Sequence, residues 1–142
     1  MARTCAAMIL RRAARSVTKI YDRILEPSSL NASQVTLLAT LRALGPQAFA
    51  DLAQILHIDR STLSRNLSVA GGRGLIRLEV GEDRRTRQVS LTRAGARALA
   101  AAYPLWLRAQ ETLEQVTDSG DLTEILTTAR HLTAAANASE PS

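Results

Sequence analysis

The order of the hydrophobic patterns along the chain is the feature that most limits its fold. Residues 74–80 and 88–91 alternate apolar and polar side chains, which predicts two short strands of one β-hairpin. Four segments with apolar residues at helical spacing precede the hairpin, and two more follow it. Aromatic residues make up 3% of the chain against 46% hydrophobic residues, which favours packed aliphatic helices over an aromatic-rich β-sandwich. The expected fold class is therefore mainly α with a small β-hairpin wing.

Capping residues, prolines and glycines set the expected ends of the helices. Asn31, with Gln34 three residues later, is typical of a capping box at the start of the second helix. Asp59 is the expected N-cap of the fourth helix, or Ser61 if that helix begins later. Pro104 should kink the fifth helix. In chain order, helices are expected over residues 3–25, 32–44, 48–57, from 60 to an end no later than 71–72, from 93 to about 116 and, after a cap at Asp121, to about 136.

The long helices at the two ends have apolar stripes but too little partner of their own. Two chains that intertwine these ends would bury the stripes. The prediction is a winged helix-turn-helix with flanking dimerisation helices, in one compact domain overall. Its parts are an N-terminal dimerisation helix (1–30), the winged helix-turn-helix DNA-binding region (31–95), C-terminal dimerisation helices (96–136) and a flexible tail (137–142).

Positive charge is concentrated in the middle of the chain. Residues 58–97 carry nine arginines against four acidic residues, whereas residues 98–142 carry two basic residues against six acidic ones. Arginine has the planar fork of donors that suits phosphates and guanine edges. The distribution indicates that one face meets a polyanion, although a solvated arginine-rich surface accounts for it equally well.

The segment after Asp59 carries polar side chains around two leucines. Leu63 and Leu67 lie one helical step apart and should face the core, which leaves the polar residues to point outward. A helix fits the major groove of DNA, and its N-terminal residues then face base edges. The alternative is an ordinary capped surface helix. The candidate DNA contacts on this helix are Arg60, Ser61, Thr62, Ser64, Arg65 and Asn66.

The loop between the two expected strands adds a second basic element. The short helix over residues 48–57 and the helix after it form a helix-turn-helix, and the hairpin that follows would be its wing. Arg84, Arg85 and Arg87 could enter the minor groove, where negative potential is concentrated. Asp83 could bond to loop N–H groups or to Arg85 and hold that guanidinium toward the groove.

In order and spacing, these segments resemble the MarR family of winged-helix regulators. The matching stretches are LAQIL (52–56), DRSTLSRNL (59–67), GLI (74–76), DRR (83–85) and LTRAG (91–95), with weaker similarity over residues 12–21 and 30–41. The resemblance implies a homodimer held by the first, fifth and sixth helices. It also implies binding to a palindromic operator in double-stranded DNA and a response to a small-molecule effector or an oxidant. We expect a repressor that the effector releases from DNA, with an activator as the alternative.

The resemblance also assigns roles to particular residues. It implies that Ser61, Thr62, Ser64 and Arg65 contact the major groove or phosphates, and that Arg85 contacts DNA from the wing tip. The chain departs from the family pattern at residues 69–73 (VAGGR), where a leucine and charged residues are usual. Two adjacent glycines there predict a recognition helix that frays early and a softer link to the wing.

Two aromatic residues and one cysteine are candidates for sensing a signal. Tyr21 and Trp106 could line an effector pocket between the dimer helices and the DNA-binding lobe, although helix packing explains both equally well. Cys5, the single cysteine, raises the alternative of an oxidant-sensing regulator. Alignment with the peroxide-sensing branch of the family places its cysteine near Ala7, so an ordinary buried or frayed cysteine at position 5 is the favoured interpretation.

The chain has no pattern typical of an enzyme, a metal site or a cofactor site. There is no P-loop or GxGxxG stretch, and His57 and His131 have no ligand cluster at metal-binding spacing. No apolar run approaches the roughly 20 residues that span a bilayer, and arginines interrupt the N-terminus. We therefore expect a cytoplasmic, non-enzymatic protein that needs no cofactor and does not associate with membranes. A winged-helix protein-interaction module without DNA binding is the alternative.

Overall fold

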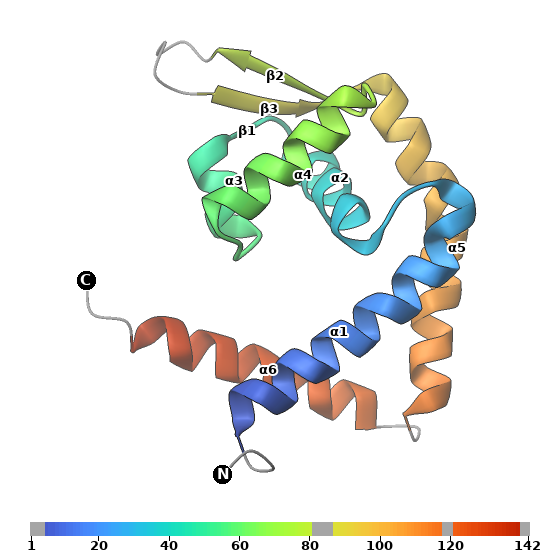
Figure 1. Cartoon of the computed structure of the whole chain (residues 1–142), viewed down its shortest axis with the longest axis vertical. Helices are drawn as coiled ribbons and strands as arrows, with labels where there is room; N and C mark the ends of the chain where they lie inside the picture. The colour runs from blue at the N-terminus through green and yellow to red at the C-terminus, as the bar shows by residue number, and fades with distance from the viewer. Residues whose placement is uncertain (1–4, 81–86, 118–120, 140–142) are drawn as a thin grey trace.

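The structure is a computed structural model that describes residues 5–80, 87–117 and 121–139. It confirms a mainly α-helical winged helix-turn-helix (Figure 1). In chain order the elements are α1 (Ala6–Leu25), the 3-10 helix η2 (Glu26–Ser28), α2 (Ala32–Leu44), β1 (Gln47–Ala48), α3 (Phe49–Ile55), α4 (Arg60–Gly72), β2 (Ile76–Val80), β3 (Arg87–Leu91), α5 (Arg93–Val116) and α6 (Asp121–Ala138).

The predicted caps of α2 and α4 are both present. The Asn31 side chain accepts a hydrogen bond from the Gln34 backbone at 2.8 Å, and the Gln34 side chain accepts one from the Asn31 backbone at 3.1 Å. Asp59 is the N-cap of α4, which removes the alternative start at Ser61. The end of α6 was predicted wrongly: the helix continues to Ala138, into the segment expected to be a tail, because an alanine-rich end has high helix propensity.

The sheet has one strand more than the sequence predicts. Its order is β1-β3-β2, and both pairings are antiparallel. Gln47 on β1 pairs with Val89, and Leu78 on β2 pairs with the same residue from the other side. Val89 therefore lies at the centre of the sheet and is fully buried. The two-residue β1 ties the start of α3 to the wing.

The three-stranded sheet packs with α2, α3 and α4 around a core made mostly of leucines; these elements are here called the lobe. Figure 1 shows the sheet lying over this helical group. Side chains from all three helices are at most 2% exposed. They are Leu37, Leu38, Leu41, Leu52, Leu63 and Leu67.

The C-terminal end of α4 is more regular and better hydrogen-bonded than its two adjacent glycines predict. The helix continues through Gly72, and Gly74 then adopts a left-handed conformation with φ of +67°. The Leu75 backbone N–H donates to the Ala70 carbonyl at 3.0 Å, and the Gly74 N–H donates to Gly71 at 2.9 Å. The prediction of early fraying is wrong, because Gly74 closes the helix with a left-handed cap and leads directly into β2.

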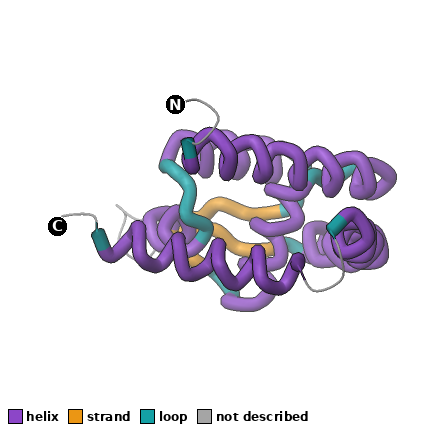
Figure 2. Tube along the Cα trace, turned by 90° about the horizontal axis from the view of Figure 1, so that it is seen from below, coloured by secondary structure: helices purple, strands orange, loops and turns teal. Residues whose placement is uncertain are grey.

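The remaining long helices, α1, α5 and α6, extend away from the lobe and are here called the arms. The hydroxyl of Tyr21 on α1 donates to the side-chain oxygen of Gln110 on α5, and α5 continues without a break through Pro104. None of the side chains of α6 is buried, although the helix carries several apolar residues. Figures 1 and 2 both place α6 and the N-terminal half of α1 at the end of the molecule away from the sheet, and Figure 2 shows that the two helices do not lie directly side by side.

Candidate nucleic-acid interface

A tight turn sets the position of α4 relative to α3. His57 lies in this turn with φ of +50°, a left-handed conformation that non-glycine residues rarely adopt. The Ile58 backbone N–H donates to the Ala53 carbonyl at 3.1 Å and closes the turn. Asp59 follows and begins α4. The result is the helix-turn-helix that the sequence predicts.

The two leucines of α4 fix which of its faces is exposed. Leu63 is fully buried and Leu67 is 2% exposed, so this side of α4 faces the core. Arg60, Ser61, Ser64 and Arg65 are exposed, whereas Thr62 and Asn66 are half-buried at the edge of that face. The described part of the chain leaves this polar face uncovered. The six candidate contacts on α4 therefore lie where a groove could reach them.

The carboxylate of Asp59 gathers three hydrogen bonds at the start of α4. The Ser61 hydroxyl donates to it at 2.5 Å, the Thr62 hydroxyl at 2.6 Å and the Thr62 backbone N–H at 2.8 Å. These bonds, with that from the Ser61 hydroxyl the strongest, hold the pKa of Asp59 well below its ordinary value. Sequence analysis assigned Asp59 only to capping. The two hydroxyl residues that follow it, Ser61 and Thr62, are the sequence signal that could have predicted the additional hydrogen bonds to its carboxylate.

Arg60 is held by an aromatic ring rather than by an acid. Its guanidinium lies over the ring of Phe49, 5.5 Å from the ring centroid. Such a cation–π contact at an exposed site is worth about 0.5–1 kcal/mol, enough to favour one orientation of a flexible side chain. Phe49 is the first residue of α3, so the contact joins the starts of the two helices of the helix-turn-helix.

The wing carries one of its predicted contacts within the described residues. Arg87 is exposed at the start of β3, where it pairs with Val80. Asp83, Arg84 and Arg85 lie outside the described residues, and so does the predicted contact between Asp83 and Arg85. Arg87 is therefore the predicted wing contact whose exposure the described residues show.

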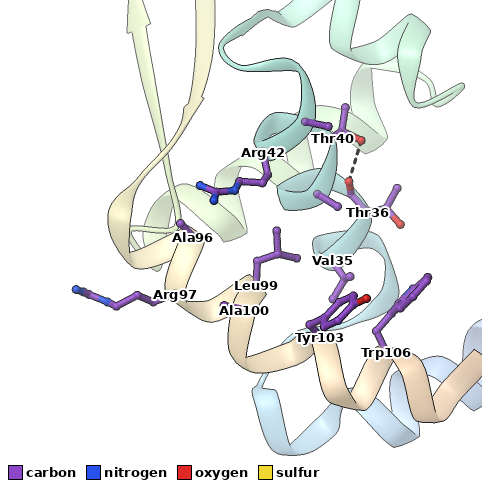
Figure 3. Close-up of a pocket in the computed structure, with 12 residues that line it drawn as sticks. Val35, Thr36, Thr40, Arg42, Ala96, Arg97, Leu99, Ala100, Tyr103 and Trp106 are labelled. Carbon is purple, nitrogen blue, oxygen red and sulfur yellow. Dashed lines mark hydrogen bonds between the residues drawn. The ribbon is translucent and has the colours of Figure 1, made fainter.

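A groove of about 880 Å³ lies between α2 and α5, and is here called the α2–α5 groove. Trp106 lines it, and its ring stacks on Tyr103 with centroids 6.0 Å apart. A role for this groove in binding an effector remains a prediction. Figure 3 shows these two rings at one side and Arg42 and Arg97 at the other. The remaining lining residues are Val35, Thr36, Ala39, Thr40, Ala43, Ala96, Leu99 and Ala100.

Tyr21 does not line this groove, and of the two interpretations that the sequence left open for it the structure favours helix packing. Tyr21 packs against the core, where burial raises the pKa of its hydroxyl, and its hydrogen bond to Gln110 joins α1 to α5. Periodicity along α1 could not reveal this contact, because the partner is 89 residues away in the chain. Tyr21 therefore positions the arms rather than the groove.

A cysteine sensor, a metal site and a membrane-spanning helix each have requirements that can be compared with the described residues. Cys5 is exposed at the N-cap of α1. In residues 5–80, 87–117 and 121–139, no three His, Cys, Asp or Glu side chains come together as a metal site would require. In the same ranges no helix combines the length and apolarity that crossing a membrane requires.

A helix-turn-helix followed directly by a β-hairpin defines a winged helix-turn-helix protein. The transcriptional regulator MosR of Mycobacterium tuberculosis, solved in complex with DNA, is 35% identical to this chain with a TM-score of 0.87. The match covers 96% of this chain and 99% of MosR. No family model matches the sequence. The chain belongs to the MarR family of transcriptional regulators.

Two more distant proteins are also similar to this chain, one in structure and one in sequence. BpsR of Bordetella bronchiseptica, whose DNA binding is regulated by 6-hydroxynicotinic acid, is 21% identical with a TM-score of 0.82. The match covers 92% of this chain and 95% of BpsR, and at this identity it shows the fold alone. The uncharacterized HTH-type transcriptional regulator YwoH of Bacillus subtilis is 27% identical over 104 residues, which are 73% of this chain and 76% of YwoH.

Proposed function

We propose that this regulator is a homodimeric repressor that binds a palindromic operator in double-stranded DNA. In each protomer α4 enters the major groove and the wing enters the adjacent minor groove. The observation that carries the proposal is the outer face of α4, where Ser61, Ser64 and Arg65 are exposed above the buried Leu63. The DNA complex of MosR, at 35% identity, supports it.

Exposed apolar side chains on α1 and α6 support the homodimer. Ile125, Leu126 and Leu132 on α6 are 44–53% exposed, and so are Ile9 and Leu10 on α1, at 46–50%. Leu10, Ile125 and Leu132 line one hollow between α1 and α6. Exposed apolar side chains grouped in this way are typical of an interface. A second copy of the chain would cover it, and the two-fold symmetry of that pair would place two α4 helices on one face for a palindrome.

Selection of bound duplexes from a random DNA pool by the full chain tests this proposal. We expect a two-fold symmetric sequence bound by two protomers, with affinity that falls steeply as salt rises because arginines displace counterions. Expression of a reporter behind that sequence should fall when the protein is present. Failure to enrich any duplex would contradict DNA binding and favour the protein-interaction module instead.

The α2–α5 groove is the place where an effector would act. Its walls are apolar and aromatic, and Arg42 and Arg97 are its two charged residues. A small aromatic acid fits this combination, since its ring would pack on the apolar wall and its carboxylate would meet a guanidinium. The regulation of BpsR by 6-hydroxynicotinic acid supports an effector of this class. Binding between α2 of the lobe and α5 of the arms would change their relative position and release DNA.

Fluorescence of Trp106, the single tryptophan, measures binding in the groove directly. We expect 6-hydroxynicotinate to change this fluorescence saturably, and its neutral amide to do so much more weakly. Arg42→Gln should weaken the response to the acid and leave thermal stability unchanged, because Arg42 is exposed. Equal responses to acid and amide would contradict an anion site.

A further inference from the structure

The three hydrogen bonds on Asp59 determine what the start of α4 can offer to DNA. A serine or threonine hydroxyl has one proton to donate and two lone pairs that accept. The single protons of the Ser61 and Thr62 hydroxyls are both directed at the Asp59 carboxylate, at 2.5 and 2.6 Å. Both hydroxyls can therefore meet an outside group only with their lone pairs, as acceptors.

The two hydrogen bonds from the Ser61 and Thr62 hydroxyls to Asp59 are strong. A hydrogen bond to an ionised carboxylate is roughly twice as strong as one between neutral groups, so a neutral base does not easily displace it. The lowered pKa of Asp59 keeps the carboxylate ionised throughout the physiological range. Asp59 and Ser61 are both exposed, so the arrangement lies on the surface that would face DNA.

Phosphate groups are poor partners for this helix start. A phosphate oxygen accepts hydrogen bonds, and neither hydroxyl has a proton left to give it. The Thr62 N–H, which would otherwise bind an anion at a helix N-terminus, already donates to Asp59 at 2.8 Å. The charge of Asp59 repels phosphate as well. Arg60, whose guanidinium is held over Phe49, is the charged donor nearest this helix start and is better suited to a phosphate than the two hydroxyls are.

The base edges in the major groove differ in whether they donate or accept hydrogen bonds. In the major groove, adenine and cytosine each present an exocyclic amino group that donates, whereas guanine and thymine present carbonyl oxygens that accept. Building on the proposed function, we infer that Asp59 is a specificity-determining residue. It fixes Ser61 and Thr62 as acceptors, so that the start of α4 selects adenine or cytosine and disfavours both keto bases and phosphate.

The substitution Asp59→Asn separates this role from helix capping. Asparagine caps a helix about as well as aspartate, so α4 should keep its stability. Its side chain has one acceptor oxygen and a donating amide, so at least one of the two hydroxyls regains a free proton. Asp51→Asn is the matched control, because it removes the same charge from an exposed position on α3, outside the cluster.

The experiment is selection from a random duplex pool by full-length wild type and both variants, with thermal melting to check the fold. Wild type should prefer adenine or cytosine, by about tenfold in affinity, at one or two positions in each half-site. In Asp59→Asn that preference should be lost or should shift to guanine or thymine, and affinity for unselected DNA should rise. Asp51→Asn should select the wild-type sequence.

Ser61→Ala gives a second, independent measurement. It removes one acceptor, so it should abolish the preference at one position in each half-site and leave the others as in wild type. An Asp59→Asn variant that melts normally and selects the same bases as wild type would overturn the inference, because Asp59 would then be a cap and nothing more. If wild type enriches no duplex at all, the proposed function fails, and the role of Asp59 in specificity fails with it.

Discussion

The lobe of this molecule contains a core of fully buried apolar side chains, whereas α6 in the arms buries none of its own. In the lobe, leucines from α2, α3 and α4 are at most 2% exposed, and β3 places Val89 at the centre of the same core. In the arms, Ile125 on α6 is 53% exposed and Ile9 on α1 is 50% exposed. The sequences of the two regions are similarly apolar, so the contrast comes from packing. The lobe completes its core within one chain, whereas the arms have an apolar surface that a second chain would complete.

The strongest test of the self-contained core is Leu38→Ala on α2. Leu38 is fully buried, and removing its side chain should lower the free energy of unfolding by about 2–5 kcal/mol, measured by chemical denaturation. Leu44→Ala is the control on the same helix, because Leu44 is 55% exposed and should change that free energy by less than about 1 kcal/mol. Equal losses from the two variants would show that burial does not distinguish them.

The second-largest loss of unfolding free energy is expected from a substitution where α5 leaves the lobe. Gly95 is buried in the first turn of α5, and a Cβ placed there would overlap the carbonyl oxygen of Leu75. Gly95→Ala should therefore cost about 1–3 kcal/mol of unfolding free energy, because backbone atoms cannot move aside cheaply. Gly72→Ala, which meets no atom within 4 Å at the end of α4, should be neutral or slightly stabilising. The same melting experiments on both variants decide the point.

The arms should show the smallest effect on folding and a clear effect on association. Ile125→Ala removes a half-exposed side chain, which should weaken the proposed dimer by about 1 kcal/mol per protomer. Sedimentation equilibrium should detect this as a larger dissociation constant, while Thr127→Ala, about 200° away around α6, should have no effect. A dissociation constant unchanged by Ile125→Ala would place the interface elsewhere.

Patterns local in sequence predicted much of this structure. The caps at Asn31 and Asp59, the alternation in the hairpin and the inward leucines of α4 all depend on neighbours within one or two turns, and the structure has each of them. The same logic predicted that the six candidate contacts on α4 would not be buried in the core. Their contact with DNA remains a prediction.

The errors came from interactions that the local pattern does not contain. β1 is two residues long, and it exists because Gln47 and Ala48 pair with β3 some forty residues later. The sequence left an effector pocket and helix packing equally open for Tyr21, because its distant partner, Gln110, gives no signal on α1. The glycines after Ala70 predicted fraying, whereas the left-handed Gly74 closes α4. The spacing of Ser61 and Thr62 after Asp59 is compatible with hydrogen bonds to its carboxylate. That both hydroxyls donate to it is seen only in the structure.

The central claim is that the exposed polar face of α4 binds DNA, and one matched comparison tests it most directly. Arg65→Ala and Arg108→Ala each remove one exposed arginine, the first from α4 and the second from the arms. Binding of both variants to the duplex selected by wild type should be measured at fixed salt, with melting as the check on folding. Arg65→Ala should bind about ten- to a hundredfold more weakly, while Arg108→Ala should bind as wild type does. If Arg65→Ala binds as tightly as wild type, α4 is not the DNA-binding surface.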